Sequence, residues 1–138
     1  MKYYSSTEFE LNQPRDGDCG YDLKSIVNAR LEPFEVQSIS TGIYIEIPVG
    51  YFGRIEERSS MGSKGVSIRG RILDRIYRGE IKVMLHNLSG TQVTIEKGDK
   101  IAQLVIIPYA DPRLIKVESV EDLSSTDRGS NGFGSTGK

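Results

Sequence analysis

Three segments of this 138-residue chain carry the side chains that could do chemistry. The first is Arg58-Ser59-Ser60, which follows strand-like residues and leads into a possible single helical turn over 59–63. A cation and two hydroxyl donors ahead of a helical turn suit an anion such as a phosphate. The same residues also fit an N-cap serine beside a surface arginine. The pattern therefore indicates either an anion site or an ordinary helix start.

Asp74 is an acidic residue in a basic stretch, with Arg69, Arg71, Arg75 and Arg78 within five residues of it. Nearby cations keep a carboxylate ionised, and an ionised carboxylate can take a proton from water. Asp74 is therefore a candidate general base. The alternative is a turn aspartate in solvated ion pairs, each worth less than about 1 kcal/mol.

The third segment, residues 126–138, is rich in glycine and cannot form a core. Ordering its backbone costs roughly 1–2 kcal/mol per residue, so we expect it to be mobile without a ligand. Glycine amides approach phosphates closely, Arg128 supplies a forked cation and Phe133 a flat stacking face. The segment lacks the lysine of a P-loop, which excludes a Walker-type NTPase. A nucleotide clamp and a plain disordered terminus remain as interpretations.

The composition limits the partners. There are 18 Lys and Arg against 19 Asp and Glu, so no basic excess favours a nucleic-acid partner. The single cysteine, Cys19, and single histidine, His86, exclude an internal disulfide and ordinary zinc sites. No apolar run reaches 18 residues, and residues 1–10 lack the features of a signal peptide. We therefore expect a cytoplasmic protein with no membrane partner.

Short strands must position these side chains. Alternating residues or short apolar runs predict strands over 43–47, 51–57, 80–85, 92–96, 101–107 and 114–118. Turn residues at 88–90 and 97–99 separate some of them, and all five prolines lie between apolar runs. No long segment has helical periodicity. The chain is therefore expected to be one all-β domain, either a sandwich, a jelly roll or a small barrel.

Five segments, in this order, resemble the five motifs of the homotrimeric dUTP pyrophosphatase (dUTPase) family. They are Gly20–Leu23, Arg58–Gly62, Ile72–Gly79, Gly98–Leu104 and Arg128–Gly137. The resemblance spans residue 18 to the C-terminus. It departs from the family pattern at Glu57, where proline is common, and at Arg71, where the third motif usually has glycine.

The resemblance implies a jelly-roll-like β-barrel or sandwich subunit that assembles as a homotrimer with sites shared between subunits. Residues 1–125 would form the core, and residues 126–138 a flexible arm that closes over the active site. The implied reaction is Mg²⁺-dependent hydrolysis of dUTP to dUMP and pyrophosphate, in the cytoplasm or in a host cytoplasm if the chain is viral. It would keep uracil out of DNA and supply dUMP for thymidylate synthesis.

The resemblance also assigns roles. Asp74 would activate a water that attacks the α-phosphorus, and Asp22 would contact Mg²⁺ through water. The groups that hold the phosphates would be Arg58, Ser59, Ser60, Gln103 and, at the far end, Arg128. Backbone groups of the strand pair around Ile72, Leu73 and Lys82 would read uracil. Tyr77 would pack under the deoxyribose, Phe133 would stack on the base, and Gly134 and Ser135 would contact the substrate as the arm closes.

Two other functions fit parts of the pattern. The dCTP deaminases resemble this fold and share an Arg-Ser-Ser segment, but they use a glutamate where this chain has Met84. A trimeric binding module without catalysis would have no need of Asp74, Gln103 and Arg128. The sequence therefore favours a dUTP-hydrolysing enzyme.

Overall fold

The computed structural model describes residues 1–131, and its regular elements are almost all strands. The strands are β1 (Lys2–Ser5), β2 (Gly20–Lys24), β3 (Ala29–Leu31), β4 (Val36–Ser40), β5 (Ile43–Glu46), β6 (Tyr51–Glu56), β7 (Val66–Arg69), β8 (Ile72–Leu73), β9 (Lys82–Asn87), β10 (Val93–Ile95) and β11 (Lys100–Pro108). The helical elements are α1 (Ser59–Gly62) and a 3₁₀ turn, η1 (Val120–Asp122). None of the helices in this described part is long and apolar enough to cross a membrane.

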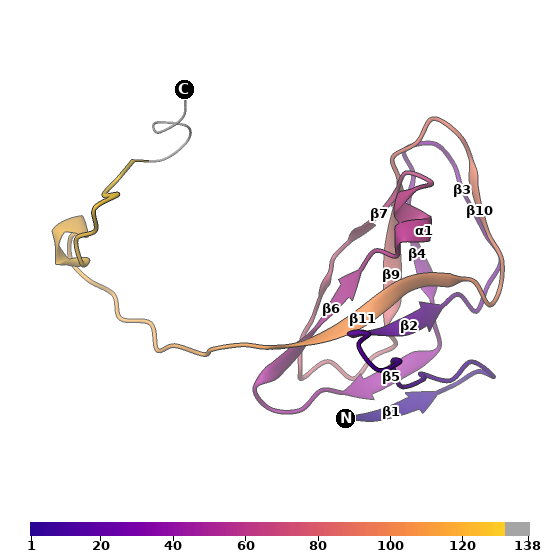
Figure 1. The fold of residues 1–138 in the computed structure, drawn as a ribbon, viewed down its shortest axis with the longest axis horizontal. Helices are drawn as coiled ribbons and strands as arrows, with labels where there is room; N and C mark the ends of the chain where they lie inside the picture. Colours follow the sequence, from indigo (N-terminus) through magenta and orange to yellow (C-terminus); the bar gives the residue numbers. More distant parts are fainter. Residues whose placement is uncertain (132–138) are drawn as a thin grey trace.

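The strands form two main antiparallel sheets and two strand pairs (Figure 1). One sheet has the order β2-β11-β6-β8 and the other β4-β9-β7, while β1 pairs with β5 and β10 with β3. Most neighbours are distant in sequence, as in a jelly-roll arrangement. The predicted all-β, jelly-roll-like class is confirmed.

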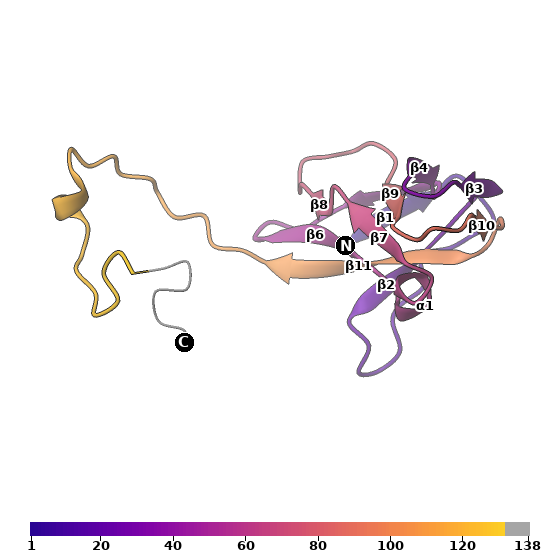
Figure 2. The same ribbon diagram turned by 90° about the horizontal axis from the view of Figure 1, so that it is seen from above.

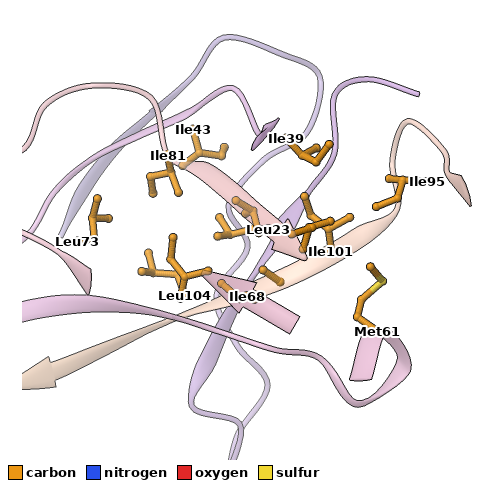
Figure 3. Close-up of a cluster of buried hydrophobic side chains, with 14 of the residues drawn as sticks. Leu23, Ile39, Ile43, Met61, Ile68, Leu73, Ile81, Ile95, Ile101 and Leu104 are labelled. Atoms are coloured by element: carbon orange, nitrogen blue, oxygen red, sulfur yellow. The ribbon is translucent and has the colours of Figure 1, made fainter. Parts of the chain in front are cut away.

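Alternating residues of both sheets meet in one core (Figure 3). Leu23 and Leu104 come from the β2-β11-β6-β8 sheet, and Ile39, Val83 and Leu85 from the β4-β9-β7 sheet. All five are at most 1% exposed. Burying one such side chain contributes roughly 1.5–3 kcal/mol. The core therefore fixes how the two sheets face each other.

Beyond β11 the chain leaves this body, and residues 110–131 extend away from it in both views (Figures 1 and 2). The predicted strand over 114–118 is wrong, because no strand of the described residues lies beside this segment to pair with it. Leu114 and Ile115 are 94% and 81% exposed. The alternation at 114–118 therefore marks apolar side chains that this subunit does not cover. The predicted division between core and arm at residue 125 stays a prediction.

Candidate active site

A cavity of about 580 Å³, called here the larger cavity, gathers four of the predicted site residues. They are Asp22 on β2, Arg58 after β6, Ser59 at the start of α1 and Gln103 on β11. Strand β11 lies between β2 and β6, and Gln103 is opposite Asp22 on one side and Glu56 on the other. Sheet pairing therefore brings together residues that are up to 81 positions apart, from Asp22 to Gln103.

Arg58 holds the end of β6 to β2. Its guanidinium donates a hydrogen bond to the Asp22 carboxylate. Its backbone has an extended conformation at the N-cap of α1, and its carbonyl accepts from the N–H of Met61 at 2.9 Å and of Gly62 at 3.0 Å. The N-cap residue is thus Arg58, without a side-chain cap, so the interpretation of an N-cap serine beside a surface arginine is wrong.

Lys100 is a site residue that the sequence analysis missed. Its ammonium group lies 2.8 Å from the second Asp22 oxygen, and it lines the larger cavity. A register shift in β11 between Lys100 and Ala102 interrupts strict alternation, so that Ile101 and Ala102 are both buried. Lys100 and Gln103 can then face the same cavity. Only the presence of a lysine within the fourth motif pointed to it.

Gly20 makes room for Gln103. A Cβ atom at Gly20 would lie 2.5 Å from the Oε1 atom and 3.0 Å from the Cδ atom of Gln103, so any other residue at position 20 would displace the Gln103 carboxamide. The carboxamide of Gln103 also donates to the backbone carbonyl of Glu57 at 3.3 Å. The glycine of the first motif and the glutamine of the fourth are therefore one packing unit.

A second cavity of about 280 Å³, called here the smaller cavity, gathers five of the residues predicted to meet the base, sugar and water. They are Ile72, Leu73, Asp74, Tyr77 and Lys82. The expected strand pair is not found: β8 pairs with β6, whereas β9 pairs with β4 and β7. Strands β8 and β9 belong to different sheets, and the connection 74–81 joins them beside the cavity. The residues predicted to read uracil therefore come from both sheets.

Asp74 is exposed at the end of β8 and forms no ion pair among residues 1–131. Three of the four nearby arginines have other partners: Arg71 binds Glu56 and Glu57, and Arg69 lies 2.7 Å from a nitrogen of His86. Arg78 donates to the Arg75 carbonyl at 2.7 Å. Asp74 does begin a turn, closed by the bond from the Tyr77 N–H to its carbonyl at 3.0 Å, but the ion pairs of that alternative are not found among residues 1–131. The carboxylate stands in the smaller cavity without a charged partner in this part of the chain.

The ring of Tyr77 is fixed at the same cavity. Its hydroxyl donates to the Glu80 carbonyl at 3.0 Å, and its N–H donates to the Asp74 carbonyl at 3.0 Å. A Cβ atom at Gly79 would lie 2.3 Å from the hydroxyl oxygen, so any other residue there would displace the ring from this position. The connection thus holds an aromatic face beside the Asp74 carboxylate.

Several predicted residues are not brought to either cavity. Ser60 is exposed on α1 and lines neither of them. Arg128 lies in the segment that leaves the body and donates to the Asn131 carbonyl at 2.8 Å. The predictions for Phe133, Gly134 and Ser135 lie outside the described residues. One subunit thus separates the predicted residues into two cavities and a distant segment.

The donors present fit only a metal that arrives with a ligand. No group of three or more His, Cys, Asp or Glu side chains that could hold a metal occurs in residues 1–131. In the larger cavity the Asp22 carboxylate already holds two cations, Arg58 and Lys100. Mg²⁺ keeps several waters and is usually bound through few carboxylates plus substrate phosphates. Asp22 therefore suits water-mediated contact with Mg²⁺ carried by phosphates.

Comparison with known proteins identifies the family. The dUTPase family model matches residues 8–137. The chain is 41% identical over 120 residues to the deoxyuridine 5'-triphosphate nucleotidohydrolase of Fowlpox virus, covering 86% of this chain and 83% of the relative. It is 50% identical over 127 residues to the enzyme of the same name from Hydrogenobaculum sp., covering 88% and 85%.

Solved structures similar to this one indicate the same family. A point mutant of the dUTPase of Staphylococcus bacteriophage 80alpha, solved with dUpNHpp, is 29% identical with a TM-score of 0.88, covering 99% of this chain and 98% of that one. A mutant dUTPase from phage phi11 of S. aureus, described with a structural Mg(II) ion, is 28% identical with a TM-score of 0.79, covering 87% and 97%. This chain, with its two cavities and its five motif segments, belongs to the dUTPase family.

Proposed function

We propose that this chain hydrolyses dUTP to dUMP and pyrophosphate. One observation carries the proposal: the dUTPase family model covers residues 8–137, which include every predicted site residue from Asp22 to Ser135. The relatives named above are deoxyuridine 5'-triphosphate nucleotidohydrolases, and a similar structure holds dUpNHpp. The reaction would keep uracil out of DNA and supply dUMP for thymidylate synthesis, in the cytoplasm of the cell or of a host.

The active unit would be a homotrimer whose sites are shared between subunits. Two features of the single subunit support this. The predicted site residues line two different cavities of one subunit, as expected if a neighbouring subunit completes each site. The extended segment also exposes five large apolar side chains that a neighbour could cover: Leu114, Ile115, Val117, Val120 and Leu123. The core would comprise residues 1–125 and the arm residues 126–138.

The larger cavity would hold the phosphate chain. The groups that would contact phosphate oxygens are Arg58, Ser59, Ser60, Gln103 and, from another subunit's arm, Arg128. A triphosphate carries about four negative charges, so it competes well with the single Asp22 carboxylate for Arg58 and Lys100. When bound, Mg²⁺ would offset the charge of the phosphate oxygens, with Asp22 accepting hydrogen bonds from its waters.

Asp74 would act as the general base. Its carboxylate takes a proton from a water molecule, and that water's oxygen forms a bond to the α-phosphorus. The bond from the α-phosphorus to the bridging oxygen breaks, and pyrophosphate leaves with the electron pair. Arg128, at the far end of the phosphate chain, would then stabilise the charge on the departing group. Asp74 suits this role because no ion pair engages it within the described chain.

The smaller cavity would select the nucleoside. Backbone groups near Ile72, Leu73 and Lys82 would pair with uracil, and an unpaired buried group costs about 1–3 kcal/mol, which disfavours cytosine. Tyr77, held by its bond to the Glu80 carbonyl, would occupy the space that a 2'-hydroxyl needs. Phe133 would stack on the base, and Gly134 and Ser135 would close over the substrate.

The deaminase alternative is not favoured. Met84, at the position where that family uses a glutamate, lines the smaller cavity with a thioether and offers no acid or base. A carboxylate at this position is what ring chemistry would require.

A substrate panel tests the proposed function. The purified chain is offered dUTP, dCTP, dTTP, dATP, dGTP and UTP with Mg²⁺, and pyrophosphate, monophosphate and ammonia are measured. We expect dUMP and pyrophosphate in equal amounts from dUTP and little from the others. Intact dUTP, or ammonia from dCTP, would contradict the proposal. Sedimentation of the same sample should give three times the subunit mass, and a monomer would exclude shared sites.

A further inference from the structure

The connection between β8 and β9 ends against the turn between β4 and β5, and three hydrogen bonds join them. The Oε1 atom of Glu80 accepts from the backbone N–H of Gly42 at 2.9 Å. The hydroxyl of Thr41 donates to the Ile81 carbonyl at 2.5 Å. The N–H of Ile81 donates to the Ile43 carbonyl at 2.7 Å. Two consecutive residues of the connection are therefore bound to three consecutive residues at the turn.

The turn between β4 and β5 is itself held in place. Thr41, Gly42 and Ile43 are all buried, and the Gly42 carbonyl accepts from the N–H of Ser6 at 2.9 Å. Gly42 has a φ of +69°, and a Cβ atom there would lie 2.2 Å from the Cγ2 atom of Thr7. The turn is therefore packed tightly against the N-terminal segment, and it gives the Glu80 carboxylate a fixed partner.

The ring of Tyr77 rests on the backbone that Glu80 anchors. Its hydroxyl donates to the Glu80 carbonyl, and a Cβ atom at Gly79 would lie 2.5 Å from the Cζ atom and 2.9 Å from the Cε2 atom of the ring. The ring thus packs directly on the main chain of Gly79. Tyr77 and Glu80 both line the smaller cavity. The side chain of Glu80 is bound to the turn, while its main chain supports the ring.

We propose that Glu80 is a positioning residue: its bond to the Gly42 N–H fixes the Tyr77 ring in the smaller cavity and so sets the preference for deoxyribose over ribose. The inference rests on the proposed function, because it needs Tyr77 to meet the sugar of a nucleotide. Every residue of this anchor belongs to one chain. The anchor therefore acts in the same way in a site whose phosphate-binding groups come from another subunit.

The anchor needs an acceptor oxygen at position 80 and does not need a charge. The other partners of the Glu80 carboxylate in residues 1–131 are distant: the Ser40 hydroxyl lies 3.4 Å and the Lys82 ammonium 3.9 Å from its Oε2 atom. A glutamine keeps the acceptor for Gly42, whereas a methionine has nearly the same length and only a weakly accepting thioether. These two substitutions therefore separate the bond to Gly42 from the size of the side chain.

The test compares Glu80→Met with Glu80→Gln in the full chain, with dUTP and UTP in competition and Mg²⁺ present. We expect Glu80→Met to lower the preference for dUTP about fivefold, with a rise in kcat/KM for UTP, because a displaced ring admits the 2'-hydroxyl. Glu80→Gln should stay within about twofold of wild type. Glu35→Met is the matched control, because the Glu35 carboxylate accepts from the N–H of Glu32 at 2.7 Å in a turn outside both cavities.

A double variant provides the second arm. Tyr77→Ala/Glu80→Met should have the same preference for dUTP as Tyr77→Ala alone, because Glu80 acts through the ring. Three results would overturn the proposal: a wild-type preference in Glu80→Met, an equal loss in Glu80→Gln, or a double variant that is less selective than Tyr77→Ala. If Glu80→Met fails to fold, the smaller Glu80→Ala decides by the same ratio.

Hydrogen exchange separates this proposal from the proposed function. Without nucleotide, the amides of Gly42 and of residues 74–81 should exchange faster in Glu80→Met than in wild type, and Glu80→Gln and Glu35→Met should match wild type there. Unchanged exchange in Glu80→Met would overturn the anchoring role. If wild-type chain leaves dUTP intact, the proposed function fails, and the exchange data still decide whether Glu80 holds the connection to the turn.

Discussion

The larger and the smaller cavity of one subunit are lined by different kinds of groups. The larger cavity is lined mainly by charged and polar side chains from the segment before β2, from β2 and β11, and from the residues after β6, with Asp22 held between Arg58 and Lys100. The smaller cavity is half that volume and is formed by a short strand, a connection and a fixed tyrosine ring. We therefore expect the first to recognise charge and the second to recognise shape. Substitutions should therefore affect affinity in the first and chemistry or selectivity in the second.

The largest effect is expected at Asp74, the one carboxylate in the smaller cavity that has no charged partner in the described chain. Asp74→Asn keeps the size of the side chain but cannot accept a proton from water. We expect kcat for Mg²⁺-bound dUTP to fall about 10²-fold or more, with KM within about threefold. Steady-state kinetics measure both constants. Unchanged turnover would remove Asp74 from the role of general base, and a change confined to KM would make it a binding group.

Arg58→Ala tests the role of charge in the larger cavity. Hydrogen bonds to charged groups contribute about 1.5–3 kcal/mol, so kcat/KM should fall roughly 10- to 100-fold, mainly through KM. The wild-type KM should also rise with salt more steeply than that of the variant. Arg30→Ala is the control, since Arg30 is an exposed arginine on β3 outside both cavities. An effect on kcat alone would mean that Arg58 acts on the transition state and not on ground-state affinity.

Tyr77→Ala tests selection by shape. Removing the ring opens the space proposed to exclude a 2'-hydroxyl, so the preference for dUTP over UTP should fall about tenfold. Tyr77→Phe is the matched control, because it keeps the ring and loses only the bond to the Glu80 carbonyl. Competition between the two nucleotides measures the ratio of kcat/KM values. An unchanged ratio in Tyr77→Ala would show that the sugar is recognised elsewhere.

The strands and turns could be predicted because alternation and turn residues act locally. Residues 43–47, 92–96 and 101–107 all lie within or next to observed strands, and Ser59–Gly62 forms the expected helical turn. The same alternation failed at 114–118, because pairing needs a neighbouring strand that this subunit does not offer. Local pattern shows which residues can pair, but not whether a partner is present.

The contacts within the site could not be predicted without knowledge of the fold. Glu57 and Arg71 each stood out only as departures from the family pattern, and their bond joins residues 14 positions apart on different elements. Lys100 reaches Asp22 through a register shift in β11 that no composition rule indicates. The separation of the site residues into two cavities likewise follows from sheet order, because β8 joins β6 while β9 joins β4 and β7.

The smallest expected effect concerns the pH dependence of stability, and it arises from Glu57, which lies in the chain between residues of the two cavities. Hydrogen bonds from Ile68 and Ser67 and the charge of Arg71 lower the pKa of this carboxyl in the folded state below its ordinary value of 4.5. A lowered folded-state pKa stabilises the protein above pH 4.5, and this contribution is lost as the pH falls through the folded-state pKa.

Glu57→Gln lacks the titrating group. The free energy of unfolding should therefore differ between wild type and variant by about 1 kcal/mol at pH 7 and by less as the pH falls below 4.5. Urea unfolding at several pH values measures this. Other acidic groups titrate in both proteins and cancel in the difference, so a gap between the two proteins that stays constant down to low pH would mean that the Glu57 contacts do not depend on its charge.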